Sequence, residues 1–252
     1  MLAEVLVRSA FHLLGNHAPD GRRYWAARYW DRTQAEEPPE LAVHYTTEKQ
    51  EIRSLIAKYA TDAGTILEIA CGTGEFTLML AQLAAEADIT ALDISAQAIE
   101  HASRRVREGA DGKQVTFRQA DVWSASDLGT YDVVVCVDAI HHLGRVPDVL
   151  GMLKRFVKPG GILIGNLWTL DNFHDLQRHR FGRLQHGWQS AMFLYTALLI
   201  RLSGGRLRTS YYRTHLLPAA RAGEVLARDY EVLYLEEPHN PHFVAFVCRP
   251  RS

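Results

Sequence analysis

Short apolar runs alternate with amphipathic segments over residues 48–168. The runs are rich in β-branched residues and bounded by glycine, proline or polar turn residues, as expected for buried strands. The predicted strands are 65–70, 88–95, 113–122, 131–140 and 162–168. Helical spacing of apolar residues predicts helices at 48–60, 76–87, 96–110 and 146–157. This alternation predicts an α/β fold with a doubly wound, parallel sheet and right-handed crossovers.

The end of the chain follows a different pattern. A helix predicted at 216–230 precedes two strands, 231–238 and 242–250, and only "HNP" separates these strands. So short a connection requires an antiparallel hairpin. The complete prediction is a Rossmann-like, seven-stranded sheet that ends in an antiparallel C-terminal hairpin.

A glycine-rich turn follows the first predicted strand, in "TILEIACGTGEFT". Backbone N–H groups of such a turn, with the helix that follows, can approach a ligand closely. Glu68 lies within the first strand, Asp93 ends the second and Asp121 ends the third. The carboxyl ends of parallel strands line the crevice in which doubly wound sheets bind ligands. The turn around Gly72 and Gly74 is therefore predicted to form part of a ligand site.

The same turn argues against two classes of nucleotide site. A dinucleotide fingerprint needs a third glycine for close helix packing, but Glu75, Phe76 and Thr77 follow Gly74. A carboxylate at the helix start would also repel a diphosphate. No "GK[ST]" follows, so a P-loop is excluded. The expected ligand has a ribose and no phosphate groups.

Five segments, in this order and spacing, resemble the class I S-adenosylmethionine-dependent methyltransferases: "LEIACGTGEFT", "ALDIS", "RQADVWS", "YDVVVCVDAIHHL" and "FVKPGGILI". The resemblance covers roughly residues 45–168 and the terminal hairpin. It implies S-adenosylmethionine as the cofactor. The residues that it implies for cofactor binding are Tyr45, Glu68, Ala70, Gly72, Gly74, Asp93, Ile94, Asp121, Val122 and Asp138.

The resemblance also implies a role for each part of this set. Asp93 would take the ribose hydroxyls, and Asp121 would meet the adenine amino group. Ile94 would lie against the adenine, to which Val122 would offer its backbone N–H. The first motif would lie near the amino-acid part of the cofactor, Asp138 near the sulfonium side, and Tyr45 over the methionine part.

We expect one domain with four parts: an N-terminal helical cap, a cofactor-binding core, a helical insertion after strand 5 on the acceptor side, and a last helix with the terminal hairpin. These parts are residues 1–47, 48–168, 169–213 and 214–252. A chain of 252 residues can bury a substantial core as a single domain.

Two neighbouring histidines, His141 and His142, follow the fourth strand. A histidine beside the cofactor could act as general base for a hydroxyl acceptor, because its pKa lies near neutrality. The alternative is a packing role beneath the loop. Methyl transfer can also proceed by alignment of the reacting atoms without any base.

Two further segments could select the acceptor. The first segment, residues 21–33, contains the pair Tyr-Trp twice, at 24–25 and 29–30. On a helix, Trp25 and Tyr29 would share one face. Such a face could stack on a flat acceptor, or it could anchor the helix to the sheet. Trp168 and Arg178 are the other residues expected near the acceptor. The complete predicted acceptor set is Tyr24, Trp25, Tyr29, Trp30, Trp168 and Arg178.

The second segment, 176–223, holds eight arginines and no Asp, Glu or Lys. Within it, residues 190–202 form a helix pattern that is apolar on nearly every side. Such a helix is buried, paired with another chain or placed against a lipid-like surface. A homodimer through 190–202, a peripheral membrane contact and an acceptor lid that reads an anionic group all remain open.

Composition narrows the setting of the protein. Apolar residues at 47%, charged residues at 23% and a net charge of −1 are typical of a globular protein. The three cysteines are too scattered for a disulfide framework or a zinc site, which favours reduced thiols and a cytoplasmic protein. The first residues carry Glu4 and Arg8 within an apolar stretch, which is unlike a signal peptide. The histidines show no paired ligand spacing, so no metal is expected.

The leading hypothesis is a methyltransferase for a small, partly apolar acceptor that resembles a secondary metabolite, with O-methylation favoured slightly over N or C. The alternative is a methyltransferase for a membrane-associated lipid or quinone. A methyltransferase-fold protein that uses its cofactor for another purpose also remains open. A nucleic-acid substrate is not expected, because "DAIHHL" stands where an "NPPY"-type segment would follow strand four.

Overall fold

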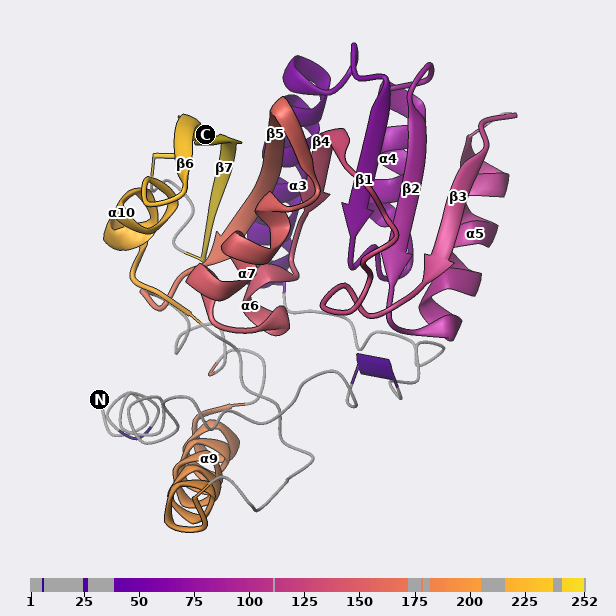
Figure 1. Ribbon diagram of the computed structural model, residues 1–252. Coiled ribbons are helices and arrows are strands. Elements are labelled where there is room, and N and C mark those ends of the chain that lie inside the picture. The colour runs from indigo at the N-terminus through magenta and orange to yellow at the C-terminus, as the bar shows by residue number, and fades with distance from the viewer. Residues whose placement is uncertain are drawn as a thin grey trace.

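The computed structural model describes residues 6, 25–26, 39–110, 112–171, 178, 182–204, 216–237 and 242–251. Its centre is a seven-stranded sheet of order β3-β2-β1-β4-β5-β7-β6 (Figure 1). The strands are β1 Thr65–Ile69, β2 Asp88–Asp93, β3 Val115–Gln119, β4 Tyr131–Cys136, β5 Val157–Trp168, β6 Tyr230–Leu235 and β7 Phe243–Pro250. The predicted fold class is confirmed.

The pairing explains why the ends of different strands meet. β1 pairs in parallel with β2 on one side and with β4 on the other. β2 in turn pairs in parallel with β3, and β4 pairs in parallel with β5. β7 is antiparallel to both of its neighbours, β5 and β6, as the short hairpin connection requires. The carboxyl ends of β1 to β5 therefore lie along one edge of the sheet.

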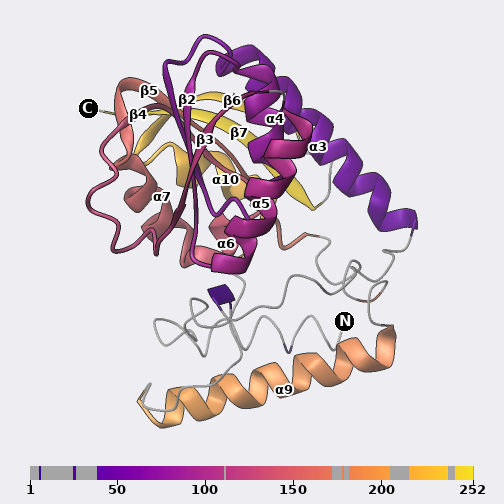
Figure 2. The same cartoon turned by 90° about the vertical axis from the view of Figure 1, so that its right-hand side faces the viewer.

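Helices cover both faces of the sheet (Figures 1 and 2). On one face lie α3, α4 and α5, and on the other α6, α7 and α10. Their bounds are α3 Pro39–Tyr59, α4 Glu75–Leu83, α5 Ala96–Gly109, α6 Ile140–Leu143, α7 Val146–Lys154 and α10 Ala222–Leu226, with a 3-10 turn, η1, at Ala219–Arg221. A further helix, α9 Arg183–Leu202, lies beyond the carboxyl edge and apart from these layers.

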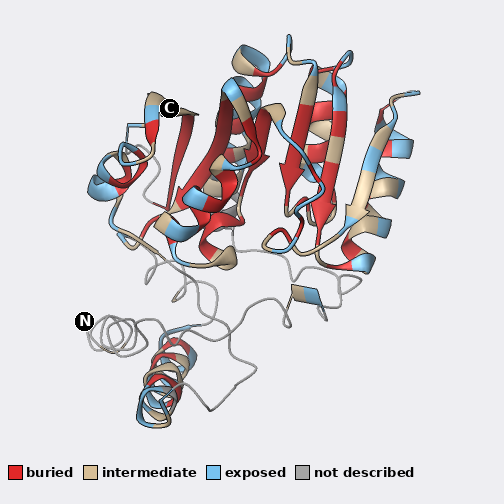
Figure 3. Ribbon diagram, viewed as in Figure 1, coloured by how far each residue is buried: buried red, intermediate tan, exposed pale blue. Residues whose placement is uncertain are grey.

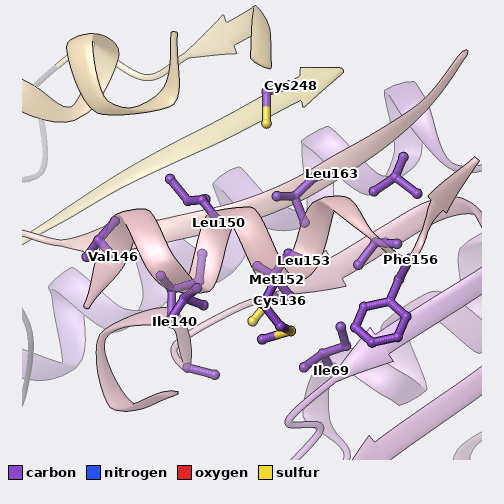
Figure 4. Close-up of a cluster of buried hydrophobic side chains, with 14 of the residues drawn as sticks. Ile69, Cys136, Ile140, Val146, Leu150, Met152, Leu153, Phe156, Leu163 and Cys248 are labelled. Carbon is purple, nitrogen blue, oxygen red and sulfur yellow. The ribbon is translucent and has the colours of Figure 1, made fainter. Parts of the chain in front are cut away.

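Both faces of the central strands are buried (Figure 3). Val134 and Cys136 of β4 belong to the cluster under α7 and α10, whereas Val133 and Val135 belong to the cluster under α3, α4 and α5. Figure 4 shows the first cluster, in which Leu150 and other α7 side chains pack toward β4 and β5. This two-sided burial accounts for the continuous apolar run in β4, which is typical of parallel strands between helices.

Several element boundaries differ from the prediction; for example, the strand predicted at 131–140 ends at Cys136, and Ile140 begins α6. The helix expected at 48–60 begins at Pro39, so the boundary drawn at residue 47 falls within α3. Val157 belongs to β5 and not to the preceding helix, which ends at Lys154. The helix expected at 216–230 is reduced to η1 and α10. The spacing of apolar residues along the chain could not locate these boundaries, because pairing with neighbouring strands decides where β5 and β6 start.

Replacement of Gly74 by alanine should destabilise the fold. Gly74 has φ 81°, and an added Cβ would lie 2.6 Å from the Ala102 Cα on α5. We expect a loss of about 2–5 kcal/mol in the free energy of unfolding, from left-handed strain and overpacking together. Gly112→Ala is the matched control, since Gly112 has φ 69° with nothing within 4 Å. Urea denaturation that gives equal losses for both variants would contradict the packing role.

Candidate functional site

The carboxyl edge of the sheet gathers the carboxylates that the sequence singled out. Glu68 lies in β1, Asp93 ends β2, Asp121 follows β3 and Asp138 follows β4. Parallel pairing of β1 with β2 and β4 brings these segments to one edge. The arrowheads of β1, β2 and β3 in Figure 1 point toward this end of the molecule.

The turn after β1 is built from left-handed residues. Ala70, Gly72 and Gly74 have φ values of 59°, 53° and 81°. The Cys71 N–H donates to the Leu92 carbonyl at 3.0 Å, which ties the turn to the end of β2. Ala70 adopts this conformation without being glycine, and such strain concentrates at functional sites. The turn is therefore held in a fixed shape by its neighbours.

Asp93 is the residue that links the turn to the second strand. Its Oδ2 accepts a hydrogen bond from the Gly72 N–H, and its Oδ1 accepts one from the Ser95 N–H, both at 2.9 Å. Burial raises the pKa of Asp93, and these backbone donors oppose that rise. Each carboxylate oxygen has more than one lone pair. Asp93 can therefore hold the turn and still accept hydrogen bonds from a ligand.

Glu68 is buried beneath the same turn. The Thr77 hydroxyl, on α4, donates to Glu68 Oε2 at 2.5 Å. Burial raises the pKa of Glu68 to about 8, which the Thr77 hydrogen bond opposes and the Asp93 charge reinforces. Glu68 is therefore mainly protonated at neutral pH, so that it does not add a second full charge beside Asp93.

Asp121 and Val122 occupy the loop after β3. Asp121 Oδ1 accepts a hydrogen bond from the Trp123 N–H at 3.0 Å, and Val122 is buried. The Trp123 indole N–H donates to the Leu143 carbonyl at 3.1 Å, which joins this loop to the end of α6. Ile94, half-buried, lies directly after Asp93.

Asp138 belongs to a buried polar cluster that the sequence analysis did not identify. Asp138 has φ 54°, and its N–H donates to the Asn166 side-chain oxygen at 2.8 Å. Asp138 Oδ1 accepts hydrogen bonds from Asn166 Nδ2 at 2.9 Å and from the Trp168 indole N–H at 3.2 Å. Asn166 Nδ2 also donates to Glu48 Oε1, from α3. The cluster thus connects α3, β5 and the residue after β4.

Two carboxyl groups in this cluster share a buried site. Burial raises the pKa of Glu48 well above its usual range, and the neighbouring Asp138 raises it further. Burial also raises the pKa of Asp138, but hydrogen bonds from Trp168, Glu48 and Asn166 oppose the rise. Glu48 is therefore the group that keeps a proton. Asn166 was the available signal, because it is a polar residue in the apolar run "ILIGNLW".

His141 and His142 lie in an aromatic stack beside the cluster. The His141 ring stacks on Trp168 with centroids 4.6 Å apart and lies 3.9 Å from the His142 ring. The His142 ring in turn lies 4.7 Å from that of Trp25. His141 is only 1% exposed, whereas His142 is half-buried. Of the two predicted base candidates, His142 is the one with accessible surface.

Tyr45 approaches the same edge from α3. Its ring lies 5.7 Å from that of Phe243, which lies 5.2 Å from the Trp168 ring. Trp25 and Trp168, from the predicted acceptor set, therefore belong to one aromatic group with the histidines.

Arg178 is half-buried near the start of α9. Tyr24, Tyr29 and Trp30 lie outside the described residues. Within the described ranges, no group of three or more His, Cys, Asp or Glu side chains is placed to hold a metal ion.

Glu68→Gln should remove part of the pH dependence of stability. The folded carboxyl holds its proton up to about pH 8, whereas the ordinary value is 4.5, so unfolding releases a proton between these values. Stability should therefore fall as pH rises through this window, by up to about 1.4 kcal/mol per pH unit. In urea denaturation from pH 5 to 8, Glu68→Gln should flatten the fall, and the exposed Glu86→Gln should not. An unchanged slope in Glu68→Gln would contradict the assignment.

Comparison with known proteins identifies similarity to methyltransferases. Residues 67–163 match the family model of a methyltransferase domain. Malonyl-[acyl-carrier protein] O-methyltransferase of Paenibacillus sp. (strain JDR-2) is 31% identical over 126 residues, which are 49% of this chain and 45% of that protein. Ubiquinone biosynthesis O-methyltransferase of Vibrio parahaemolyticus is 31% identical over 146 residues, which are 54% of this chain and 55% of that protein. The chain therefore spans less than two thirds of the length of these relatives.

A solved structure with a similar fold is that of magnesium protoporphyrin IX methyltransferase from Synechocystis PCC 6803 with bound S-adenosylhomocysteine. It has a TM-score of 0.60 at 18% identity and covers 92% of this chain and 97% of its own. At this identity the likeness concerns the fold. Residues 67–163 therefore match a methyltransferase domain, and the sequence relatives and the sheet order agree with this match.

Proposed function

We propose that the protein transfers a methyl group from S-adenosylmethionine to a small, partly apolar acceptor, with a hydroxyl oxygen favoured over nitrogen or carbon. The observation that carries the proposal is the Asp93 carboxylate, which accepts a backbone hydrogen bond from Gly72 on one oxygen and from Ser95 on the other at the edge of the glycine turn. It leaves lone pairs for the two hydroxyls of a ribose. Glu75 at the start of α4 disfavours a phosphate at the same place.

The residues at the carboxyl edge fit this cofactor. Asp93 would hold the ribose, and Asp121 with Val122 would hold the adenine. The turn of Ala70, Gly72 and Gly74 would lie along the amino-acid part, with Glu68 beneath it and Tyr45 near the methionine part. When bound, S-adenosylmethionine supplies an electrophilic methyl group. A mainly neutral Glu68 limits the negative charge beneath the turn, so its carboxyl can contribute a hydrogen bond without strongly repelling the methionine carboxylate.

The acceptor side is aromatic and partly apolar. Trp168, His142 and Trp25 provide ring surfaces beside Asp138. Flat or apolar acceptors gain affinity from such surfaces by stacking and by burial of apolar area. Two of the relatives are named as O-methyltransferases, one for malonyl-[acyl-carrier protein] and one in ubiquinone biosynthesis, which supports an oxygen acceptor. A membrane-associated lipid or quinone is the second candidate, because α9 exposes large apolar side chains near this edge.

Transfer to a hydroxyl releases a proton, and His142 is the residue proposed to accept it. His141 is enclosed between Trp168 and His142, so its role would be to hold the His142 ring. Asp138 accepts a hydrogen bond from the Trp168 indole N–H and would keep that ring in position.

The test is turnover with a panel of phenolic, aliphatic hydroxyl, amine and carboxyl acceptors, followed by release of S-adenosylhomocysteine. We expect release with at least one hydroxylated acceptor. Asp93→Ala should weaken S-adenosylhomocysteine binding about tenfold in calorimetry, given the worth of charged hydrogen bonds. Asp127→Ala, at a carboxylate that pairs with Arg118 outside the turn, is the control. An unchanged dissociation constant for Asp93→Ala would overturn the ribose assignment, and no release with any acceptor would overturn the activity.

His142→Ala should lower kcat about 100-fold with a hydroxyl acceptor, since loss of a general base has an effect of this order. Its affinity for S-adenosylhomocysteine should stay the same. His101→Ala on α5 is the matched control and should keep its activity. If His142→Ala also retains kcat, transfer proceeds by alignment alone and the base role is wrong.

A further inference from the structure

The α9 helix carries a stripe of large apolar side chains on its exposed face. Leu184 is 92% exposed, Trp188 68%, Tyr195 56% and Leu202 74%. With Ala191 and Leu198, the exposed positions follow a spacing of four and three residues, so they form one line along the helix. We call the six residues the α9 stripe: Leu184, Trp188, Ala191, Tyr195, Leu198 and Leu202.

The opposite face of α9 is mixed in character, with Phe193 half-buried among smaller and polar residues. His186, Ser190, Thr196 and Ala197 are buried, and the Ser190 hydroxyl donates to the His186 carbonyl at 2.8 Å. A surface helix normally turns its large apolar side chains inward and its polar ones to water. α9 instead leaves a line of large apolar side chains exposed to water, and a continuous exposed apolar surface of this kind marks an interaction site.

The charge around the stripe selects the kind of partner. Arg183 and Arg201 are exposed at the two ends of α9. The sequence from 176 to 223 contains eight arginines and no acidic residue. A partner that covers the stripe meets positive charge at both of its ends, and this charge favours an anionic surface.

A second copy of the chain fits this charge poorly. In a parallel pair of α9 helices, Arg183 of one helix would lie close to Arg183 of the other, and Arg201 would lie close to Arg201. In an antiparallel pair, Arg183 of one helix would lie close to Arg201 of the other. Neither arrangement brings a carboxylate to the arginines, so both place like charges together.

We propose that the α9 stripe docks on the surface of a lipid bilayer that contains anionic headgroups. Leucine side chains would enter the acyl boundary, Trp188 and Tyr195 would sit at the headgroup level, and Arg183 and Arg201 would meet the headgroup phosphates. Among the helices in the described part of the chain, none has the length and apolarity to cross a membrane. The helix therefore lies on the bilayer and does not span it.

Docking through α9 would determine which way the carboxyl edge of the sheet faces relative to the bilayer. α9 lies beyond the carboxyl edge of the sheet in both views (Figures 1 and 2). Docking through α9 would turn the edge that carries Asp93 and Asp138 toward the bilayer. The docking surface stands on exposure and charge alone, so it does not depend on the proposed activity.

The test is cosedimentation of the full chain with vesicles, without cofactor or acceptor. The wild type should bind phosphatidylcholine vesicles that contain phosphatidylglycerol and should not bind phosphatidylcholine alone. Arg183→Gln with Arg201→Gln should weaken binding about 30-fold, on the basis of about 1 kcal/mol for each arginine near an anionic surface. Arg105→Gln with Arg107→Gln, exposed on α5, changes net charge equally and should bind as the wild type does.

The apolar part is tested by Leu184→Gln, Trp188→Gln and Leu202→Gln combined, which should abolish sedimentation. Val43→Gln is the control, because Val43 is 62% exposed on α3. All substituted side chains are exposed, and thermal unfolding checks that each variant folds. Three outcomes would overturn the proposal: no binding by the wild type, equal binding to neutral vesicles, or a wild-type dimer in sedimentation velocity that the triple variant loses. The last would assign the stripe to a second copy of the chain.

Discussion

The hydrogen bonds that Asp93 accepts from Gly72 and Ser95 are the constraint on which the carboxyl edge depends. They fasten the turn after β1 to the end of β2 and to the start of α5. Gly74 completes this arrangement by allowing α4 to lie against Ala102 of α5. A carboxylate that is buried by the fold thus shapes the turn before any ligand arrives.

The site concentrates acidic groups, and their protonation follows from burial. Burial raises the pKa values of Glu48, Glu68, Asp93 and Asp138. Donors stabilise Asp93 and Asp138 as carboxylates, whereas Glu48 and Glu68 tend to keep their protons. The cost of burying these groups is offset by hydrogen bonds within the cluster and by neutralisation. Four buried acids therefore carry fewer than four negative charges, and the charge that remains on Asp93 and Asp138 suits the cationic cofactor proposed for this edge.

The opposite chemistry appears in α9, where arginines accompany an exposed apolar stripe. The two regions lie on the same side of the sheet, so a surface that binds α9 would also face the acidic edge. This division separates attachment from chemistry, because the α9 stripe and the Asp93 turn share no residue. Substitutions in one region can be tested without altering the other.

The sequence by itself determined the strands, the parallel direction of the first five and the carboxylates at their ends, because apolar periodicity and glycine turns are local properties of the chain. Asp93, Gly72 and Gly74 were found in this way. Tertiary structure alone decided the role of Glu48, which lies 118 positions before its partner Asn166 and looks like a solvent-facing residue in its helix. It also decided which face of the apolar helix 190–202 is exposed. Local spacing describes what a helix carries, but the packing of distant segments decides which side of it meets water.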